Sequence, residues 1–550
     1  MKHTPTLLLL TLASLPLAAL AQKGQREAPP GMFKDLDDAI LGDALVLHGK
    51  QLFIDDHVIG EMQGVEKKLN RPVKHPANPV LRSDQPWEHL MSYGAVIHDP
   101  GDGLFKLWYT DWTADKDPVA TTCYATSKDG ISWQKPVINP QEGTNRVMFD
   151  PPEPYAGYAG VIIDPRERDA SRRYKMLYSA KPTGKVSSIA VHLAYSADGI
   201  HWKQEPKNPL IPYSDTQIAP YWDAPRGRYV AYLRFGPPNI RLISRIESED
   251  FLHWSPKVTV IGHRGTPQAG VVAAVNQLGA AKMATKSKLD EPLSTVFYGM
   301  AAMPYAGVHI GLLNTYHGET IQPIPEDKLW MDRKDVQLTF SRNGLTWQRV
   351  GRNGAFTAED LHSDRDWKQE ALDAAFISYG ELHKDWDGGS IDCPHHAPLI
   401  VGDEIRFYYT AGIGRNWAKY HKDAETHAVG LATLRLDGFV SVDAGNEPGT
   451  LTTKPLVFIG DTLEINANAA GGSLTVEALD AQGQPIPGFS AADGTPITTD
   501  SVRHIVRWKD NPDCQLLQAR PIRLRFHLKN ARLYAFEPRI RHNHYLQTKD

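Results

Sequence analysis

The amino-acid sequence predicts an all-β protein, and three observations carry this prediction. First, a Ser-x-Asp-Gly-x-x-Trp pattern recurs along the chain. Second, the 550 residues include 44 Gly, 40 Pro, 13 Trp and 21 Tyr, a composition rich in turn formers and in aromatic residues that favour strands. Third, apolar residues occur in short runs or alternate with polar ones, as they do in strands, and little of the chain has a helical period.

The repeated motif marks the end of a copied structural unit. It occurs at residues 127–133, 196–202 and 341–347, and in a further copy at 248–254 Phe251 replaces the glycine. Asp-Gly or Asn-Gly closes a tight turn, because glycine accepts a positive φ and the Asx side chain bonds the nearby backbone. The Trp that follows returns the chain to a strand and supplies a large apolar group. Such repetition is the signature of a repeat architecture.

Short apolar runs before each motif predict the strands of each copy. In chain order they cover residues 93–97, 105–109 and 122–126, then 160–163, 174–178 and 191–195, then 217–222, 229–233 and 241–244, then 296–300, 309–313 and 336–340, and finally 397–401, 405–409 and 429–433. Five copies of three to four strands, joined by long and uneven loops, are typical of a β-propeller. The sequence therefore predicts a five-bladed β-propeller over residues 46–440.

Residues 441–550 have a different pattern. Apolar and polar side chains alternate strictly in several short segments, which predicts strands that are buried on one face. These segments are residues 463–466, 474–478, 505–508 and 522–528. We predict a C-terminal β-sandwich that packs on the propeller, and the alternative is that it binds carbohydrate.

The first 45 residues predict export. Residues 1–21 contain one basic residue, Lys2, then an apolar run, and end in Ala19-Leu20-Ala21, which is the pattern of a cleaved signal peptide. Residues 22–45 have no clear pattern and are predicted to form an extended arm. We expect a secreted or periplasmic protein with no membrane span in the mature chain, since no later segment reaches the required apolar length.

Charge and cysteine content exclude several classes of function. The formal net charge is −4 and no basic tract is present, which argues against nucleic acid as a partner. The three cysteines are far apart, so they form neither a disulfide framework nor a Cys-x-x-Cys metal site. No phosphate-binding glycine loop occurs. The sequence predicts no cofactor and no bound metal.

The repeated Ser-x-Asp-Gly-x-x-Trp ends, the Val-Ile-x-Asp-Pro strands at 96–100 and 161–165, and the appended sandwich carry a family resemblance. Together they resemble the five-bladed propeller glycoside hydrolases, the group that contains families 32, 43 and 130. The stretch 53–56 is most similar to uncharacterised exported relatives in that group. The resemblance implies a hydrolase that cleaves terminal or short-oligosaccharide glycosidic bonds. The signatures of family 32 are absent, so fructosidase activity is not implied.

Glycosidic cleavage needs a protonated carboxylic acid near the leaving oxygen and a second carboxylate that activates water or attacks the sugar. The innermost strands of a propeller converge on one axis, so acidic residues just before those strands face a common pocket. This reasoning predicts four catalytic candidates, one from each of the first, second, third and fifth blades: Glu88, Glu153, Asp215 and Asp392. We predict Asp215 as the general acid or its close partner, and one of the others as base or nucleophile.

Further residues are candidates for binding an oligosaccharide or polysaccharide substrate. The aromatic candidates could stack on sugar faces, Arg234 could orient a carboxylate or hold a hydroxyl, and two adjacent histidines could line the pocket wall. The set comprises Trp87, Tyr155, Arg234, Tyr298, His395 and His396. The structural alternative is that the aromatic residues pack between blades and that Arg234 bridges two blades.

Two other functions stay open. The first is a non-catalytic carbohydrate-binding propeller, which is favoured because Ser92 and Tyr93 stand where the first blade should supply an acid. The second is a sialidase. A sialidase turn has one more residue between Asp and Gly than the turns of this chain, and the enzyme needs an arginine cluster with a tyrosine nucleophile.

Overall fold

The computed structural model describes residues 43–113, 119–181, 184, 189–234, 242–261, 296–317, 332–350, 375–394, 397–414, 427–511 and 513–541. These residues form strands and short 3-10 turns and contain no α-helix, which confirms the predicted all-β class. Within the same residues no helix is long and apolar enough to cross a membrane. The predicted signal peptide, most of the predicted arm, and His395 and His396 lie outside the described residues.

Five of the seven sheets are built on one plan, with the strands mainly antiparallel and in chain order from the innermost outwards. Blade 1 contains β7 (Leu90–Asp99), β8 (Leu104–Trp112), β9 (Ala120–Ser127) and β10 (Trp133–Gln134). Blade 2 contains β12 (Gly157–Ile163), β13 (Tyr174–Ala180) and β14 (Ala190–Ser196), followed by β15 (His201–Gln204), β11 (Met148–Asp150) and β16 (Ile211–Pro212). Blade 3 contains β17 (Ala219–Asp223), β18 (Arg228–Arg234), β19 (Ile243–Ser248) and β20 (Val258–Ile261).

The last two blades include short extra strands. Blade 4 contains β21 (Val296–Tyr305), β22 (Val308–His317) and β23 (Arg333–Ser341), with β24 (Gln348–Arg349) and β25 (Ala375–Ile377) both paired to β23. Blade 5 contains β26 (Ser390–Pro394), β27 (Leu399–Val401), β28 (Glu404–Gly412) and β29 (Ala428–Arg435). Its outer edge is completed by β5 (Val73–Lys74) and β6 (Leu81–Arg82), which both pair with β29.

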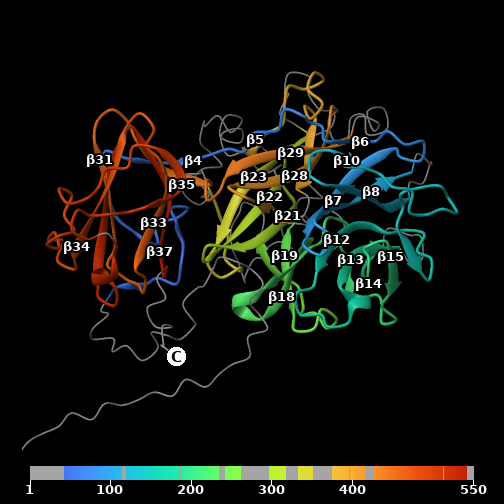
Figure 1. Cartoon of the computed structure of the whole chain (residues 1–550). Helices are drawn as coiled ribbons and strands as arrows, with labels where there is room; N and C mark the ends of the chain where they lie inside the picture. Colours follow the sequence, from blue (N-terminus) through green and yellow to red (C-terminus); the bar gives the residue numbers. More distant parts are fainter. Residues whose placement is uncertain are drawn as a thin grey trace, which may run out of the picture.

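The innermost strands close into a ring. β7 contacts β12, β12 contacts β17, β17 contacts β21, β21 contacts β26, and β26 contacts β7. The five sheets therefore surround one axis in chain order, as Figure 1 shows by the progression of colours around the larger part of the molecule. Because the outer strands of blade 5 come from residues 73–82, pairing between distant parts of the chain closes the ring.

The repeated turns also join neighbouring blades. In the first turn Ser127 Oγ accepts the amide of Gly130 at 2.9 Å and Asp129 Oδ1 accepts the amide of Ser132 at 2.8 Å. Three of the turn carbonyls accept a bond from an aromatic side chain on the second strand of the preceding blade. These bonds are Trp108 Nε1 to Gly199 O at 2.7 Å, Tyr232 OH to Gly344 O at 2.9 Å and Tyr408 OH to Gly130 O at 2.7 Å.

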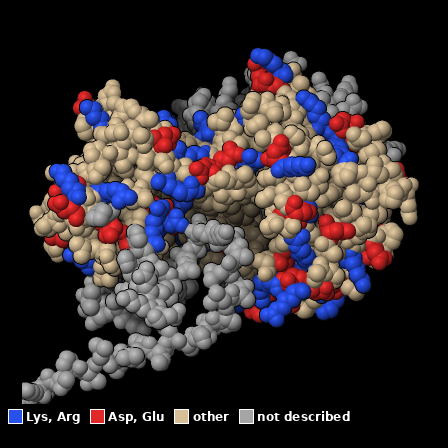
Figure 2. Space-filling model, viewed as in Figure 1, with Lys and Arg blue, Asp and Glu red and all other residues tan. Residues whose placement is uncertain are grey.

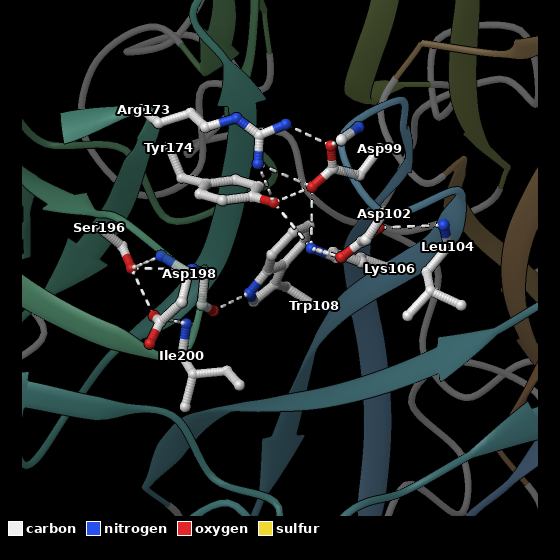
Figure 3. A network of polar contacts seen from close by, with 12 residues as sticks. Asp99, Asp102, Leu104, Lys106, Trp108, Arg173, Tyr174, Ser196, Asp198 and Ile200 are labelled. Atoms are coloured by element: carbon white, nitrogen blue, oxygen red, sulfur yellow. Dashed lines mark hydrogen bonds and ion pairs between the residues drawn. The ribbon is translucent and has the colours of Figure 1, made fainter. Parts of the chain in front are cut away.

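A second contact between blades starts from the Asp-Pro turn after the innermost strand. Asp99 is fully buried and accepts hydrogen bonds from Lys106 at 2.8 Å, from Arg173, and from the hydroxyl of Tyr174 in blade 2 (Figure 3). Asp164 repeats the arrangement one blade further on, where it accepts from Lys175 and from the hydroxyl of Tyr229. These aspartates are thus structural and link one blade to the next.

Two further six-stranded sheets share one apolar core, and we call them the two-sheet domain. One sheet contains β1 (Leu45–Val46), β3 (Ile59–Gln63), β31 (Gly449–Thr453), β32 (Leu456–Val457), β34 (Ser473–Asp480) and β36 (Ile522–Lys529). The other contains β2 (Gln51–Leu52), β4 (Glu66–Leu69), β30 (Val440–Ala444), β33 (Thr462–Asn468), β35 (Asp500–Ile505) and β37 (Ala531–Arg539). Buried residues of both sheets, such as Leu463 and Phe526, form the core.

The strand pairing corrects the predicted division of the chain at its N-terminal end. Residues 45–69 belong to the two-sheet domain, whereas the sequence pattern placed residues 46–440 in the propeller. The reason is packing, since Phe53 is fully buried and its ring centroid lies 6.5 Å from that of Phe526 and 5.9 Å from that of Phe536. In Figure 1 the blue N-terminal ribbon accordingly runs among the red C-terminal strands.

The two-sheet domain is joined to blades 4 and 5 by a buried contact. Asp437, 1% exposed, accepts hydrogen bonds from Lys50 at 3.0 Å, Tyr305 at 2.5 Å and Asn466 at 3.1 Å. Apolar residues of both parts, including Phe439, form one cluster around it. On the face drawn in Figure 2 the surface is hollowed between the two parts.

Candidate functional site

Four of the five innermost strands contain a β-bulge near their beginning. The register shifts between Ser92 and Gly94, Gly157 and Gly160, Phe297 and Gly299, and Ile391 and Pro394. A bulge takes a residue out of the ladder and re-aims its side chain. The residues displaced in this way include Tyr93, Tyr158, Tyr298 and Asp392. Tyr93 and Tyr158 have φ values of 43° and 58°, a strained conformation for a bulky residue that is concentrated at functional sites.

The displaced tyrosines meet in an aromatic cluster at the centre of the ring. The rings of Tyr93 and Tyr158 lie edge to face with centroids 4.8 Å apart, and Trp112 lies 5.8 Å from Tyr158. Tyr298 packs against the same cluster. We call Tyr93, Trp112, Tyr158 and Tyr298 the axial aromatic cluster. It joins blades 1, 2 and 4.

Asp215 lies next to this cluster, just before the innermost strand of blade 3. Its Oδ1 accepts from Arg234 Nη1 at 2.6 Å, and its Oδ2 accepts from the hydroxyl of Tyr213 at 2.6 Å. Arg234 is buried, and its guanidinium lies 4.7 Å from the centroid of the Tyr298 ring and donates to the Tyr298 carbonyl at 3.1 Å. The Asp215 side chain remains 21% exposed, so solvent reaches the carboxylate.

A second ion pair approaches the same tyrosine from blades 4 and 5. Lys334 Nζ lies 4.5 Å from the Tyr298 ring centroid and forms an ion pair with Asp392, which is 7% exposed. Tyr298 is therefore contacted by two cations, and each cation is paired with a predicted catalytic carboxylate. We call Asp215, Arg234, Tyr298, Lys334 and Asp392 the axial charge network. It unites four of the ten residues that were predicted from sequence.

Two more predicted residues flank the network on the blade 2 side. The amide of Tyr155 donates to Glu153 Oε1 at 3.3 Å, and burial raises the pKa of the Glu153 carboxyl. Burial also raises the pKa of the Tyr155 phenol, with a smaller contribution from the charge of Asp215. Tyr155 is therefore linked to Glu153 through its backbone amide and senses the charge of Asp215, and Trp112 packs against its ring with centroids 6.1 Å apart.

Sequence reasoning missed several residues of this site. Lys257 Nζ donates to the carbonyls of Tyr213 and, at 3.2 Å, of Arg234. Burial lowers the pKa of Lys257 to about 8, although the nearby charge of Asp215 raises it. Lys257 and Lys334 come from outer parts of their blades, so no inner-strand pattern could identify them. A signal for Tyr93 did exist, because it stands where an acid was expected.

The structure does not bring Trp87 and Glu88 into the axial site. The Glu88 side chain is fully buried within blade 1 and accepts from the Tyr109 hydroxyl, from Lys135 at 2.5 Å and from two backbone amides at 3.0 and 3.1 Å. Trp87 Nε1 donates to Asn145 at 2.9 Å. These contacts use the hydrogen-bonding capacity of both side chains inside the blade, which gives them a structural role and corrects the predicted catalytic role of Glu88.

The axial site holds no grouping of metal ligands among the residues that the structure describes. In that part of the chain, no three or more His, Cys, Asp or Glu side chains lie close enough to bind an ion together. His395 and His396, the predicted wall residues, lie outside it.

The chain was compared with known proteins. No family model matches it, and no curated protein matches it. Solved structures similar to it include a glycosyl hydrolase from Bacteroides ovatus, which is 12% identical over 67% of this chain and 94% of its own, with a TM-score of 0.40.

Two further similar structures have different stated activities. One carries a name that refers to the GH130 family of mannoside phosphorylases and to glycoside hydrolases that target β-1,2 mannosidic linkages in Candida mannan. It is 14% identical over 69% of this chain and 95% of its own, with a TM-score of 0.39. The other is an N-acetylgalactosamine deacetylase from F. plautii, 15% identical over 68% of this chain and 96% of its own, with a TM-score of 0.43.

Proposed function

We propose that this protein is a glycoside hydrolase that cleaves terminal or short-oligosaccharide glycosidic bonds at the axial site. One observation carries the proposal. Asp215 and Asp392, which come from different blades, are held in one charge network around Tyr298, beside an aromatic cluster. The half-buried carboxyl group of Glu153 is bonded to the backbone of Tyr155, whose ring packs against that cluster. Apolar surface with a few convergent polar groups is typical of small-molecule binding sites.

The environments of the carboxyl groups favour different roles for them. Burial raises the pKa of Glu153, so this group is suited to keep a proton and donate it to the leaving oxygen. Both oxygens of Asp215 accept hydrogen bonds, one of them from the buried guanidinium of Arg234, and a carboxylate in such a pair is suited to act as base or nucleophile. We therefore assign the acid to Glu153 in place of Asp215.

The remaining residues of the site have supporting roles. Asp392, paired with Lys334, is the second carboxylate available to the reaction. Tyr298 and Trp112 are partly exposed, and we assign them the binding of sugar faces. Tyr213 and Lys257 hold the Asp215–Arg234 pair in position.

The proposal is tested by sugar release from a broad panel of glycosides. We expect Asp215→Asn to lower the rate at least about a hundredfold. The matched control is Asp403→Asn, because Asp403 also pairs with an arginine, Arg503, but its side chain is 60% exposed and lies outside the axial site. Full activity in Asp215→Asn would contradict the proposed site.

A second variant separates the acid from the base. Glu153→Gln should lose activity on glycosides with alkyl or sugar leaving groups but retain it on aryl glycosides, whose leaving groups need little protonation. Asp215→Asn should lose activity on both. The absence of release by the wild-type protein, together with sugar binding that depends on Asp215, would instead favour a carbohydrate-binding propeller.

We also propose that the protein is exported and that residues 1–21 are removed. The composition of this segment supports the proposal. N-terminal sequencing of protein from the periplasm or medium should begin at Gln22. Full-length protein retained in the cytoplasm would contradict export.

A further inference from the structure

A lysine at the edge of the axial site is not used by the proposed mechanism. Lys181 follows β13, and its Nζ lies 4.1 Å from the centroid of the Tyr155 ring. Tyr155 in turn contacts Trp112 of the axial aromatic cluster and is close enough to Asp215 for the carboxylate charge to raise the pKa of its phenol. Lys181 is therefore placed on the blade 2 side of the proposed sugar-binding surface.

The charge of Lys181 has no anionic partner within the described part of the chain. There the cations of the axial charge network each pair with a carboxylate, whereas Lys181 forms no ion pair. Its ammonium group lies over the face of Tyr155, which attracts a cation weakly. Burial alone lowers the pKa of Lys181, so no carboxylate among the described residues offsets the cost of its partial burial.

Partial burial of an ammonium group is unfavourable unless an anion offsets the charge. Lysine is strongly hydrated and binds anionic oxygens as a point charge. A ligand that stacks on the aromatic surface and carries an anionic group towards blade 2 would supply the missing counter-charge.

We propose that Lys181 binds an anionic substituent of the ligand, so that the substrate of the axial site is an acidic glycoside. The inference that the ligand is a substrate rests on the proposed function. The anion-binding role of Lys181 does not depend on it. A carboxylate, as in a uronic acid, and a sulfate or phosphate ester share the required chemistry.

The test measures binding before activity. Matched methyl glycosides are titrated calorimetrically into the Asp215→Asn variant. This variant is chosen because, if the proposed function is correct, it turns its ligand over slowly. The glycosides are a hexoside, its uronide, and its 6-sulfate and 6-phosphate esters, with inorganic phosphate as a separate arm. We expect one anionic series to bind at least about tenfold more tightly than the neutral hexoside, the size of one charge-assisted contact.

The decisive variant is Lys181→Met, which keeps the aliphatic stem and removes the charge. This variant should bind the anionic and neutral ligands equally well, and added salt should no longer weaken the binding of the anionic ligand. Lys181→Arg should retain part of the preference and part of the salt dependence. The matched control is Lys207→Met, an exposed lysine of the same blade, which should change neither.

The outcomes separate this inference from the proposed function. Anion binding that depends on Lys181, without sugar release by the wild-type protein, would support the inference and contradict the hydrolase. Release of neutral sugars with the same KM in Lys181→Met and wild type, and no preference for any anionic ligand, would overturn the inference and leave the hydrolase intact. The series that binds identifies the anionic group.

Discussion

Asp111 shows how one buried side chain ties the stability of the fold to pH. It lies near the end of β8 inside blade 1, is fully buried, and accepts the amide of His89 at 2.9 Å through Oδ1. Its Oδ2 has no hydrogen-bond partner among the residues described. Burial raises the pKa of Asp111 to about 7, the charge of Glu88 adds to the rise, and Arg146 and Lys135 act against it.

The first prediction concerns this group. An unfolded aspartate has a pKa of about 3.9, so between about pH 4 and pH 7 the native state binds the proton more tightly than the unfolded state. The free energy of unfolding contributed by Asp111 should therefore fall as the pH rises through that window, by at most about 1.4 kcal/mol per pH unit. Urea denaturation of wild type and Asp111→Asn across this range checks it.

In the Asp111→Asn variant the side-chain amide would keep an acceptor for His89 but could not titrate, so the variant should lose this part of the pH dependence. Asp102→Asn, in an exposed turn, is the control and should keep it. Identical pH profiles for Asp111→Asn and wild type would show that Asp111 is ionised in the native state.

A second prediction concerns Asp99, whose carboxylate pairs with Lys106 in blade 1 and with Arg173 in blade 2. Replacing Asp99 with Asn leaves the buried Lys106 with Asp102 as its remaining carboxylate partner among the described residues, and weakens the contact with Arg173 and Tyr174. Breaking a buried pair on one side typically costs about 3–5 kcal/mol. We expect Asp99→Asn to lower the free energy of unfolding by about this amount, measured by chemical denaturation, while Asp129→Asn in an exposed turn costs about 1 kcal/mol or less.

At the scale of the element, the repeated turn tolerates one departure from its pattern. Phe251 stands where the other described turns have glycine, and its φ is 68°. Its side chain is fully buried, with ring centroids 5.1 Å from Tyr229 and 5.2 Å from Trp254. Leu177 occupies the position in blade 2 that Trp108 and Tyr232 occupy in blades 1 and 3. Within the described part of the chain, this turn therefore receives no hydrogen bond from an aromatic side chain of the preceding blade.

These two effects oppose each other, and their magnitudes decide a third prediction. Replacing Phe251 with glycine removes the strain of a non-glycine residue at positive φ, which should raise the free energy of unfolding by about 1–2 kcal/mol. Losing the buried phenylalanine ring should lower it by about 3–5 kcal/mol. Phe251→Gly should therefore destabilise the protein by about 2 kcal/mol although it restores the repeated motif. An increase in the denaturation midpoint would show that strain outweighs packing at this turn.

At the scale of the whole molecule, the two ends of the described chain depend on each other. Residues 45–69 supply four strands of the two-sheet domain, and residues 73–82 complete blade 5. The domain boundary therefore does not follow a single cut in the sequence. Asp437 and its partners Lys50, Tyr305 and Asn466 lie where the two parts meet.

The fourth prediction follows from this interleaving. A fragment of residues 46–440, the extent predicted for the propeller, would leave β2 and β4 without their partners β37 and β30. It would also expose Leu52 and Phe53, which are buried in the whole chain. We expect this fragment to be insoluble or to lack cooperative unfolding, whereas residues 43–541 fold. A soluble fragment with a sharp thermal transition would contradict the proposed dependence.

The five sets of apolar runs predicted the number and order of the blades, and the four copies of the turn motif marked the ends of the first four sets because each copy has the same local chemistry. The sheets that residues 45–82 join, and the innermost strand of blade 5, were not predicted, because a sequence pattern shows where strands form but not which strands pair. Residues 45–82 have strand-forming segments, but alternation does not tell which sheet a strand joins. In blade 5 the innermost strand is β26, which begins at Ser390, whereas the apolar run at 397–401 predicted an innermost strand that is instead β27.

The candidate site was predictable only in part. Asp215 and Asp392 were found because acidic residues were expected just before inner strands, Arg234 because it follows a predicted strand of blade 3, and Tyr298 because an aromatic ring can stack on a sugar. Glu88 satisfied the rule for acidic residues, yet the loop before β7 turns its carboxylate into blade 1. Lys334 and Lys257 reach the axis from outer parts of their blades, which no pattern along the chain records.

The closure of blade 5 has a consequence for how the protein is made. Asn78 and its partner Leu431 are 353 residues apart, so the N-terminal segment leaves the ribosome long before the strand that receives it. Contacts of such high sequence separation form slowly. During synthesis residues 45–82 must wait unpaired, and a chaperone or secretion apparatus that holds unfolded chains would find this segment available until translation is almost complete.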